Sequence, residues 1–217
     1  MKEPHIKVIF WDLGRVLIKF DHMKACRELT EYSPLDTDEV YTAIFVDTPK
    51  INDVYNVGGI TSIEFFAQVK EKLSLDDEVN YEKFVAIWSS IFEPNEDILK
   101  LLARIPIDIP QCIVSNINEI HWEALRHYDI FKTYFIDESK IILSYVAHSH
   151  KPNSKIYNDA LIAIGMTETD IPQILYIDDI EEYRNAFKSR GGNAIAYDNS
   201  KDDISVLEAG LRNYGII

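Results

Sequence analysis

Cysteine is scarce in this chain. Only Cys26 and Cys112 occur among 217 residues, and they lie far apart. Neither belongs to a Cys-x-x-Cys pair, so the sequence does not indicate a disulfide framework. Cys112 lies in the apolar run 110–114 and is expected to be a small buried hydrophobic residue.

Positive charge and long apolar runs are also lacking. The chain has 22 Lys and Arg against 36 Asp and Glu, a net charge of -14, and no basic block. This argues against a surface that follows the phosphates of a nucleic acid or an anionic membrane. No run reaches membrane-spanning length, and residues 1–5 carry no hydrophobic signal region. We expect a cytoplasmic protein with no nucleic-acid or membrane partner, and a monomer is favoured.

The chain does have an apolar fraction of 47%, which is typical of a globular protein. Short β-type runs recur at 7–11, 111–115, 140–143, 174–177 and 193–197. Segments with helical periodicity lie at 117–127, 154–164, 181–190 and 203–211. Strands that alternate with helices predict an α/β fold, a Rossmann-like parallel sheet with helices on both faces.

The interval between about residues 22 and 92 breaks this alternation. It carries amphipathic helical patterns at 23–32, 38–46, 62–73 and 81–91, with no convincing strand. A helical block directly after the first strand predicts an all-α cap over the active face; the alternative is that these helices only cover one side of the sheet. We assign 18–94 to the cap domain, and 1–17 with 95–217 to the core domain.

Polar side chains follow several predicted strands. They are Asp12, the pair Ser115-Asn116, Lys151 before Pro152, and the pair Asp178-Asp179. In an open parallel sheet, ligands bind outside the carboxyl ends of the strands. These residues form a coherent chemical set, which comprises a carboxylate that can attack, a hydroxyl with an amide, a cation and a paired acidic site.

Each of these signals has a purely structural alternative. Asp12 could form a turn or cap a helix, and Ser115-Asn116 could cap a helix that begins at Ile117. Lys151 could be solvated, and the acidic pair could cap the helix at 181–190. However, two adjacent carboxylates repel each other unless a cation or solvent relieves them, and hard divalent metals prefer oxygen ligands. Four such signals in this order favour one site.

Together these motifs resemble those of the haloacid dehalogenase superfamily, in its branch with a helical cap after the first motif. The first motif resembles residues 10–17 and the second 113–116. The third resembles Lys151-Pro152 with 156–157, and the fourth 176–179. The Asp-Leu-Gly form of the first motif is similar to that of sugar-phosphate phosphatase-like members.

The resemblance implies a two-step phosphatase mechanism. Asp12 would attack phosphorus and form an aspartyl phosphate, which water then hydrolyses. Mg²⁺ would be bound by Asp12, the backbone carbonyl of Gly14 and Asp179, with Asp178 in its outer shell.

The resemblance also implies a phosphate-binding set. Ser115 and Asn116 would hydrogen-bond the phosphate oxygens, and Lys151 would neutralise charge on the nucleophile and on the transferring group.

One departure concerns proton transfer. Family phosphatases usually have a second aspartate two residues after the nucleophile as general acid and base, and here that position is Gly14. General acid catalysis is typically worth about 10²–10⁴-fold, so a substrate with an acidic leaving group, such as an anomeric phosphate, fits best.

Other departures leave alternatives open. His148 and His150 could supply a substitute acid or a metal pair, or be surface residues. Arg15 could contact the substrate or form a salt bridge to the cap. Tyr183 stands where the family often has asparagine.

The leading hypothesis is a Mg²⁺-dependent phosphatase that hydrolyses a small phosphomonoester, for example a sugar phosphate. The alternative is a catalytically weakened phosphate-binding or regulatory protein, which Gly14 keeps open. Dehalogenation is disfavoured because the acidic pair would repel a haloacid, and a phosphomutase would need the missing aspartate.

Overall fold

A five-stranded parallel sheet forms the centre of the computed structural model, which describes residues 5–217; residues 1–4 of the predicted core lie outside it. The strand order is β5-β4-β1-β6-β7. The bounds are β1 Val8–Trp11, β4 Gln111–Ser115, β5 Ile141–Leu143, β6 Ile174–Asp178 and β7 Asn193–Ala196. All five predicted strands are therefore confirmed, with their ends shifted by one residue at most.

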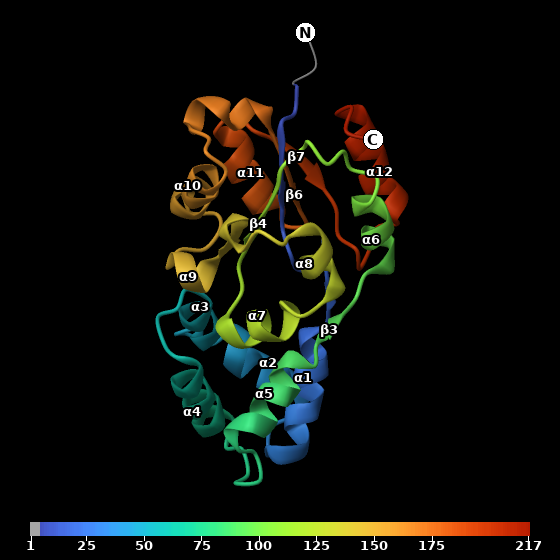
Figure 1. The fold of residues 1–217 in the computed structure, drawn as a ribbon. Coiled ribbons are helices and arrows are strands. Elements are labelled where there is room, and N and C mark those ends of the chain that lie inside the picture. The colour runs from blue at the N-terminus through green and yellow to red at the C-terminus, as the bar shows by residue number, and fades with distance from the viewer. Residues whose placement is uncertain (1–4) are drawn as a thin grey trace.

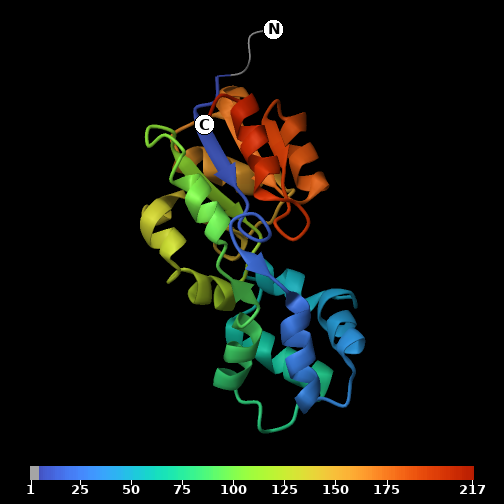
Figure 2. The ribbon, with the colours of Figure 1, turned by 90° about the vertical axis from the view of Figure 1, so that its right-hand side faces the viewer.

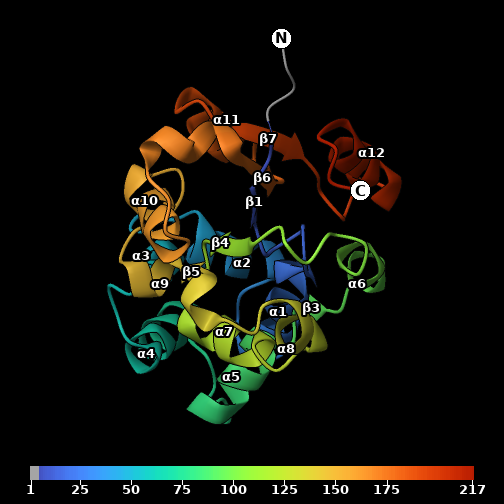
Figure 3. The same ribbon diagram turned by 45° about the horizontal axis from the view of Figure 1, so that its top comes forward.

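Helices cover both faces of this sheet (Figures 1 and 3). Alternate residues of β1 point to opposite faces, as the strand geometry requires. Ile9 and Trp11 belong to a hydrophobic cluster with α6 (Glu96–Leu102), α7 (Glu119–Leu125), α8 (Asp129–Tyr134) and α12 (Ile204–Asn213). Val8 and Phe10 belong to another with α10 (Ser154–Ala163) and α11 (Glu181–Ser189). The α/β fold class is confirmed.

Five helices form a separate group beyond the sheet, the helical insert (Figure 2). They are α1 His22–Leu29, α2 Thr37–Phe45, α3 Ile51–Asn56, α4 Ser62–Leu73 and α5 Tyr81–Ser89. Their apolar faces enclose a third hydrophobic cluster, to which the core contributes Ile120. The insert thus has a hydrophobic core of its own. The division into two domains at residues 18 and 94 remains our interpretation.

Short 3-10 and α-helical turns complete the chain. They are η1 Thr30–Tyr32, η2 Glu138–Lys140, α9 Ser144–Ala147 and η3 Glu168–Gln173. No helix within residues 5–217 combines the length and the apolar character that crossing a membrane requires.

Both passages of the chain between core and insert lie in one small antiparallel ribbon. It consists of β2 (Lys19–Phe20) and β3 (Phe92–Glu93), in which Lys19 pairs with Glu93 and Phe20 with Phe92. No strand was expected between about residues 22 and 92; β2 lies before this interval and β3 begins at its last residue. Strands of two residues are too short to show an alternating pattern.

Local signals set the starts of the insert helices. The Thr61 hydroxyl accepts a hydrogen bond from Glu64 N–H, and the Glu64 carboxylate accepts one from Thr61 N–H, which closes a capping box at α4. Asp36 and Glu39 form the same box at α2. Helix α7 begins at Glu119, two residues later than predicted, because Asn118 rather than Ser115-Asn116 is its N-cap.

Candidate active site

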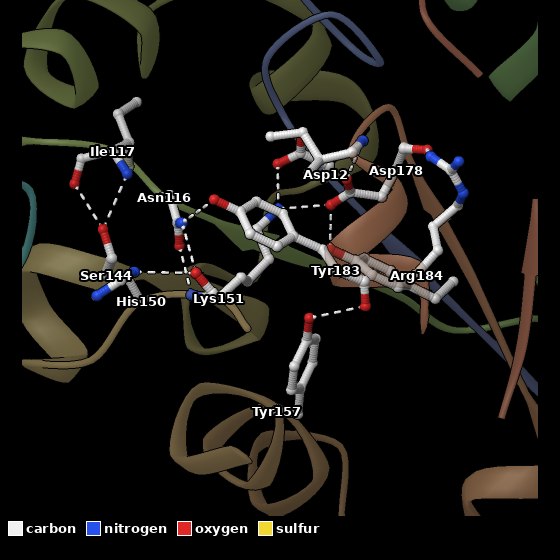
Figure 4. A network of polar contacts seen from close by, with 12 residues as sticks. Asp12, Asn116, Ile117, Ser144, His150, Lys151, Tyr157, Asp178, Tyr183 and Arg184 are labelled. Atoms are coloured by element: carbon white, nitrogen blue, oxygen red, sulfur yellow. Dashed lines mark hydrogen bonds and ion pairs between the residues drawn. The ribbon is translucent and has the colours of Figure 1, made fainter. Parts of the chain in front are cut away.

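The carboxyl ends of three neighbouring strands bring the predicted polar residues together. Asp12 follows β1, Ser115 ends β4 and Asp178 ends β6, and all three side chains are buried. The strands are held in register by parallel pairing of β1 with β4 and with β6. The loop before α10 adds Lys151 from the side, as Figure 4 shows.

Lys151 is the centre of this group. Its side chain is 1% exposed, and its Nζ lies 2.7 Å from Asp12 Oδ1 and 2.7 Å from Asp178 Oδ2. Burial alone would lower the pKa of Lys151, but the two carboxylates raise it well above its ordinary value. The solvated lysine that the sequence left open is therefore excluded, and Lys151 carries a positive charge between two carboxylates.

Asp178 is fully buried, and both of its carboxylate oxygens accept hydrogen bonds from groups of the protein. Oδ2 accepts hydrogen bonds from Lys151 and from the Tyr176 hydroxyl, and Oδ1 accepts one from Ile180 N–H at 2.7 Å. These contacts make Asp178 the anchor that holds the Lys151 ammonium group in place. Its predicted outer-shell contact to a metal stays a prediction.

The carboxylates of Asp12, Asp178 and Asp179 form an acidic cluster. They offer oxygen atoms that all lie within 4.8 Å of one another. Burial, opposed by Lys151 and reinforced by the other two carboxylates, raises the pKa of Asp12 to about 7. Burial and then Asp178 raise the pKa of Asp179 to about 6. One ammonium group does not offset three carboxylates, so the cluster suits a divalent cation with oxygen ligands.

Asn116 has its side chain in use within the protein. Its Oδ1 accepts a hydrogen bond from Lys151 N–H at 2.7 Å, and its Nδ2 donates to Lys151 O and to the Tyr183 hydroxyl, each at 3.1 Å. Asn116 and Tyr183 thus fix the backbone that carries Lys151. The predicted contact between the Asn116 side chain and phosphate remains a prediction, and it would require these bonds to rearrange.

A small cavity of about 60 Å³ lies between the core and the helical insert. The core lines it with Gly14, Ser115 and Asn116, the β2–β3 ribbon with Phe20 and Phe92, and the insert with His22. A Cβ atom on Gly14 would lie 2.6 Å from Phe20 Cε1, so Phe20 fills the space beside Gly14. Neither Phe20 nor His22 was singled out from the sequence, since both reach the site only through the packing of the insert.

His148 and His150 do not line this cavity. His148 is exposed, with Nδ1 3.1 Å from Val57 O, and His150 is exposed, with Nδ1 2.9 Å from Lys151 O. The structure therefore favours the alternative in which both histidines are surface residues.

Arg15 forms no salt bridge to the insert or to any other part of residues 5–217. Its Cζ lies 5.2 Å from the centroid of the Phe20 ring, and its φ is 57°. The predicted alternative of an ion pair to the cap is therefore wrong, because Arg15 packs on an aromatic face instead.

No family model and no curated protein matches the sequence. Solved structures do match. A HAD family enzyme from Bacteroides thetaiotaomicron, in complex with magnesium and inorganic phosphate, is 23% identical with a TM-score of 0.77, covering 93% of this chain and 98% of that one.

Two further structures are similar. A predicted HAD-like family hydrolase from Porphyromonas gingivalis is 19% identical, with a TM-score of 0.77 over 96% of this chain and 98% of its own. The L-2-haloacid dehalogenase of Xanthobacter autotrophicus, with chloropropionic acid covalently bound, is 15% identical, with a TM-score of 0.59 over 98% and 84%. These likenesses extend over nearly the whole chain, helical insert included. The chain therefore has the fold of the haloacid dehalogenase superfamily.

Proposed function

We propose that this protein is a Mg²⁺-dependent phosphatase that hydrolyses a small phosphomonoester through an aspartyl phosphate on Asp12. The observation that carries the proposal is the Lys151 Nζ, 2.7 Å from both Asp12 and Asp178, beside the acidic cluster. This arrangement provides a nucleophile, a fixed cation and oxygen ligands for a metal within one buried site.

Asp12 supplies the nucleophile. One of its oxygens attacks phosphorus, the bond to the leaving-group oxygen breaks, and the electron pair leaves with that oxygen. Lys151 holds Asp12 Oδ1, which orients the carboxylate and offsets its charge as the anionic phosphate approaches. Water then attacks phosphorus, the bond between phosphorus and the Asp12 oxygen breaks, and the carboxylate is restored.

Asp12 and Asp179, together with the Gly14 carbonyl, would hold Mg²⁺. The raised pKa values of Asp12 and Asp179 support this role. Burial and mutual repulsion disfavour the negatively charged form of both carboxylates, and a bound cation would favour it. When bound, the ion would offset the charge of the phosphoryl group and of the carboxylate that attacks it. The Ser115 hydroxyl and the Asn116 amide remain the candidates for contact with phosphate oxygens.

The acidic cluster also distinguishes between phosphoryl and haloacid substrates. Three carboxylates with one lysine would repel the carboxylate of a haloacid, whereas a metal ion bound there would attract a phosphate. The structurally similar enzyme from Bacteroides thetaiotaomicron was solved with magnesium and inorganic phosphate, which supports the same assignment here.

The missing carboxylate at position 14 narrows the substrate class. Without a general acid, the leaving group must depart with little help from a proton, which favours leaving groups of low pKa. An anomeric sugar phosphate meets this requirement.

The test is hydrolysis of para-nitrophenyl phosphate, whose leaving group barely needs an acid. We expect turnover with Mg²⁺, none with a chelator, and none for a folded Asp12→Asn variant, because an amide is nearly isosteric but is not a competent nucleophile. Asp108→Asn, at an exposed loop position, serves as the matched control and should match the wild type. Turnover by folded Asp12→Asn at the wild-type rate would refute the covalent route.

A second candidate function rests on Gly14 itself. A chain that retains the phosphate site but lacks the acid could be a phosphate-binding or regulatory protein. In that case the wild type would bind inorganic phosphate in the presence of Mg²⁺ yet release no nitrophenol.

A further inference from the structure

We propose that His22 is the general base that activates water when the phosphoenzyme is hydrolysed. This inference rests on the proposed function and adds a residue to it. His22 is the first residue of α1, directly after the ribbon that joins core and insert, and it lines the cavity that also contains Gly14 and Ser115. It therefore faces the side of the site on which the family's second aspartate is missing.

The ring of His22 is held by aromatic contacts and not by hydrogen bonds: it meets Phe20 edge to face, is tilted against Phe45 and stacks on His121. Its centroid lies 4.8 Å from that of Phe20 and 4.8 Å from that of Phe45, and 6.1 Å from that of His121. Within residues 5–217, neither ring nitrogen has a hydrogen-bond partner, although the side chain is only partly exposed. The ring is thus fixed in position while its nitrogens remain available.

His121, the other histidine that lines this cavity, has a different environment. Its Nε2 lies 3.0 Å from Trp88 O and its Nδ1 lies 3.1 Å from Asn118 Nδ2. Both nitrogens are therefore in use, and His121 is a structural residue. Among the histidines at the cavity, His22 alone can exchange a proton with a bound molecule.

Phe20 explains why the base would come from the insert. It occupies the space in which a side chain on residue 14 would begin, 2.6 Å from an ideal Cβ there. The ring of His22 packs against the same Phe20 ring. The space of the missing carboxylate at position 14 is therefore filled by an aromatic ring, and the imidazole of His22 packs edge to face against that ring.

The surroundings of His22 keep its imidazole neutral. Burial and the positive charge of Arg15 lower the pKa of His22, and Asp21 opposes them only in part. His121, which stacks on it, is also neutral, because burial lowers its own pKa. A neutral imidazole is the form that accepts a proton, so His22 suits a base more than an acid.

The water oxygen forms a bond to phosphorus while one water proton passes to a ring nitrogen of His22. The bond between phosphorus and the Asp12 oxygen breaks, and its electron pair restores the carboxylate. The imidazolium then releases its proton to solvent as phosphate leaves.

Pre-steady-state hydrolysis of para-nitrophenyl phosphate with Mg²⁺ tests this role. The variant His22→Phe keeps an aromatic ring between Phe20 and Phe45 but removes both nitrogens. We expect a full burst of one nitrophenol per enzyme, because the first step needs no base. We expect the steady-state kcat to fall by about 10²–10⁴-fold, with KM falling alongside it, because the phosphoenzyme accumulates.

The variant His22→Ala adds a test that distinguishes a catalytic role of His22 from a structural one. Imidazole added to the solution should restore part of its turnover, and should not affect His22→Phe, in which the space is filled. His148→Ala, an exposed histidine outside the cavity, is the matched control and should keep wild-type kinetics.

The outcomes separate the two proposals. Wild-type kcat in His22→Phe, or loss of the burst together with turnover, would overturn the role of His22 while leaving the phosphatase intact. Absence of turnover in the wild type would instead contradict the proposed function. If His22→Phe does not fold, His22→Gln gives the same comparison of burst and steady state.

Discussion

Two adjacent aspartates of the acidic cluster have different environments, and this separates their roles. Asp178 is saturated by Lys151, Tyr176 and the backbone of Ile180, whereas Asp179 is partly exposed. The first stabilises the fold around Lys151, and the second is free to bind a cation.

We therefore expect opposite effects from Asp178→Ala and Asp179→Ala. Asp179→Ala should raise the Mg²⁺ concentration for half-maximal activity at least about tenfold, and leave the metal-free stability unchanged or higher, because a repulsive charge is removed. Asp178→Ala should lower the unfolding free energy by about 3 kcal/mol, because it breaks a buried ion pair. Urea denaturation and Mg²⁺ titration measure both, and the reverse pattern would contradict the assignment.

The Phe20 ring limits which residue can replace Gly14. The φ of Gly14 is not in the left-handed region, so its backbone conformation is compatible with a side chain. The Phe20 ring, however, occupies the space that this side chain would need. Gly14→Asp alone should lower the unfolding free energy by about 1–3 kcal/mol through overpacking. Gly14→Asp combined with Phe20→Ala should fold, and should flatten the dependence of rate on leaving-group pKa by favouring alkyl phosphates.

The control for this experiment is Phe20→Ala alone, which makes room without adding an acid and should keep the steep dependence. Rates over a series of aryl and alkyl phosphates supply the measurement. An unstrained Gly14→Asp single variant would show that Phe20 moves aside more easily than its packing indicates.

At the residue scale, the sequence predicted the residues whose positions follow from strand ends. Asp12, Ser115 and Asp178 meet because the carboxyl ends of parallel strands share one edge. Phe20 and His22 were not predicted, because their place over the site depends on how the helical insert packs. The anchoring role of Tyr176 was also missed, since an aromatic residue in a buried strand ordinarily indicates only core.

At the scale of elements, α7 is the main junction between core and insert. The Ser62 hydroxyl donates to Glu119, Tyr55 Oη accepts from Ile120 N–H at 3.1 Å, and His121 donates to Trp88 O at 3.0 Å. Four rings, those of Phe45, Trp88, His121 and His22, follow one another at centroid distances of 5.9, 5.4 and 6.1 Å. This junction holds the insert over the site.

The buried histidine in this junction predicts a pH-dependent stability. Burial lowers the pKa of His121 to about 3, whereas in the unfolded chain it is about 6.5. Between these values the unfolded state binds more protons, so the unfolding free energy falls as the pH falls below 6.5. From pH 7 to 5 the contribution of His121 is about 2 kcal/mol.

Urea denaturation of the wild type and His121→Gln at pH 7 and pH 5 provides the measurement. The variant should be less stable at pH 7 but should lose less on acidification. His22, whose pKa is also lowered, contributes in the same direction and remains in both proteins. An equal loss in both proteins would show that His121 is already protonated in the folded state.

The predicted elements that the structure confirms carry either an apolar, strand-like run or a helical period in the sequence. The strands at 111–115 and 174–177 and the helices at 62–73 and 154–164 are of this kind. Helices α3, α6, α8 and α9 were missed because four to seven residues give too little pattern for an apolar face. The ribbon β2–β3 was missed for the same reason.

At the scale of the whole molecule, charge is unevenly offset. The chain carries a net charge of -14, and three of its carboxylates are concentrated in the acidic cluster. A cation bound only by the folded state shifts the folding equilibrium in proportion to its affinity.

Magnesium should therefore stabilise the whole fold. At a concentration about 100 times its Kd, Mg²⁺ should raise the unfolding free energy by about 2.7 kcal/mol, provided that the unfolded chain does not bind it. Thermal unfolding with and without Mg²⁺ measures the effect. NaCl at equal ionic strength is the control, because salt also screens the net negative charge. Equal shifts with the two salts would indicate screening and no specific site.

The ribbon β2–β3 has a consequence for how such a chain can change. Phe20 and Phe92 are paired in this ribbon, so the chain leaves the core for the insert and returns to it at one place. We therefore expect the core to tolerate replacement of the whole segment between these two residues, much as a hairpin tolerates a new loop. Recombination within this ribbon would replace the insert side chains that line the cavity, His22 among them, while leaving Asp12, Lys151 and the acidic pair untouched, so the surroundings of the substrate can change without loss of the nucleophile.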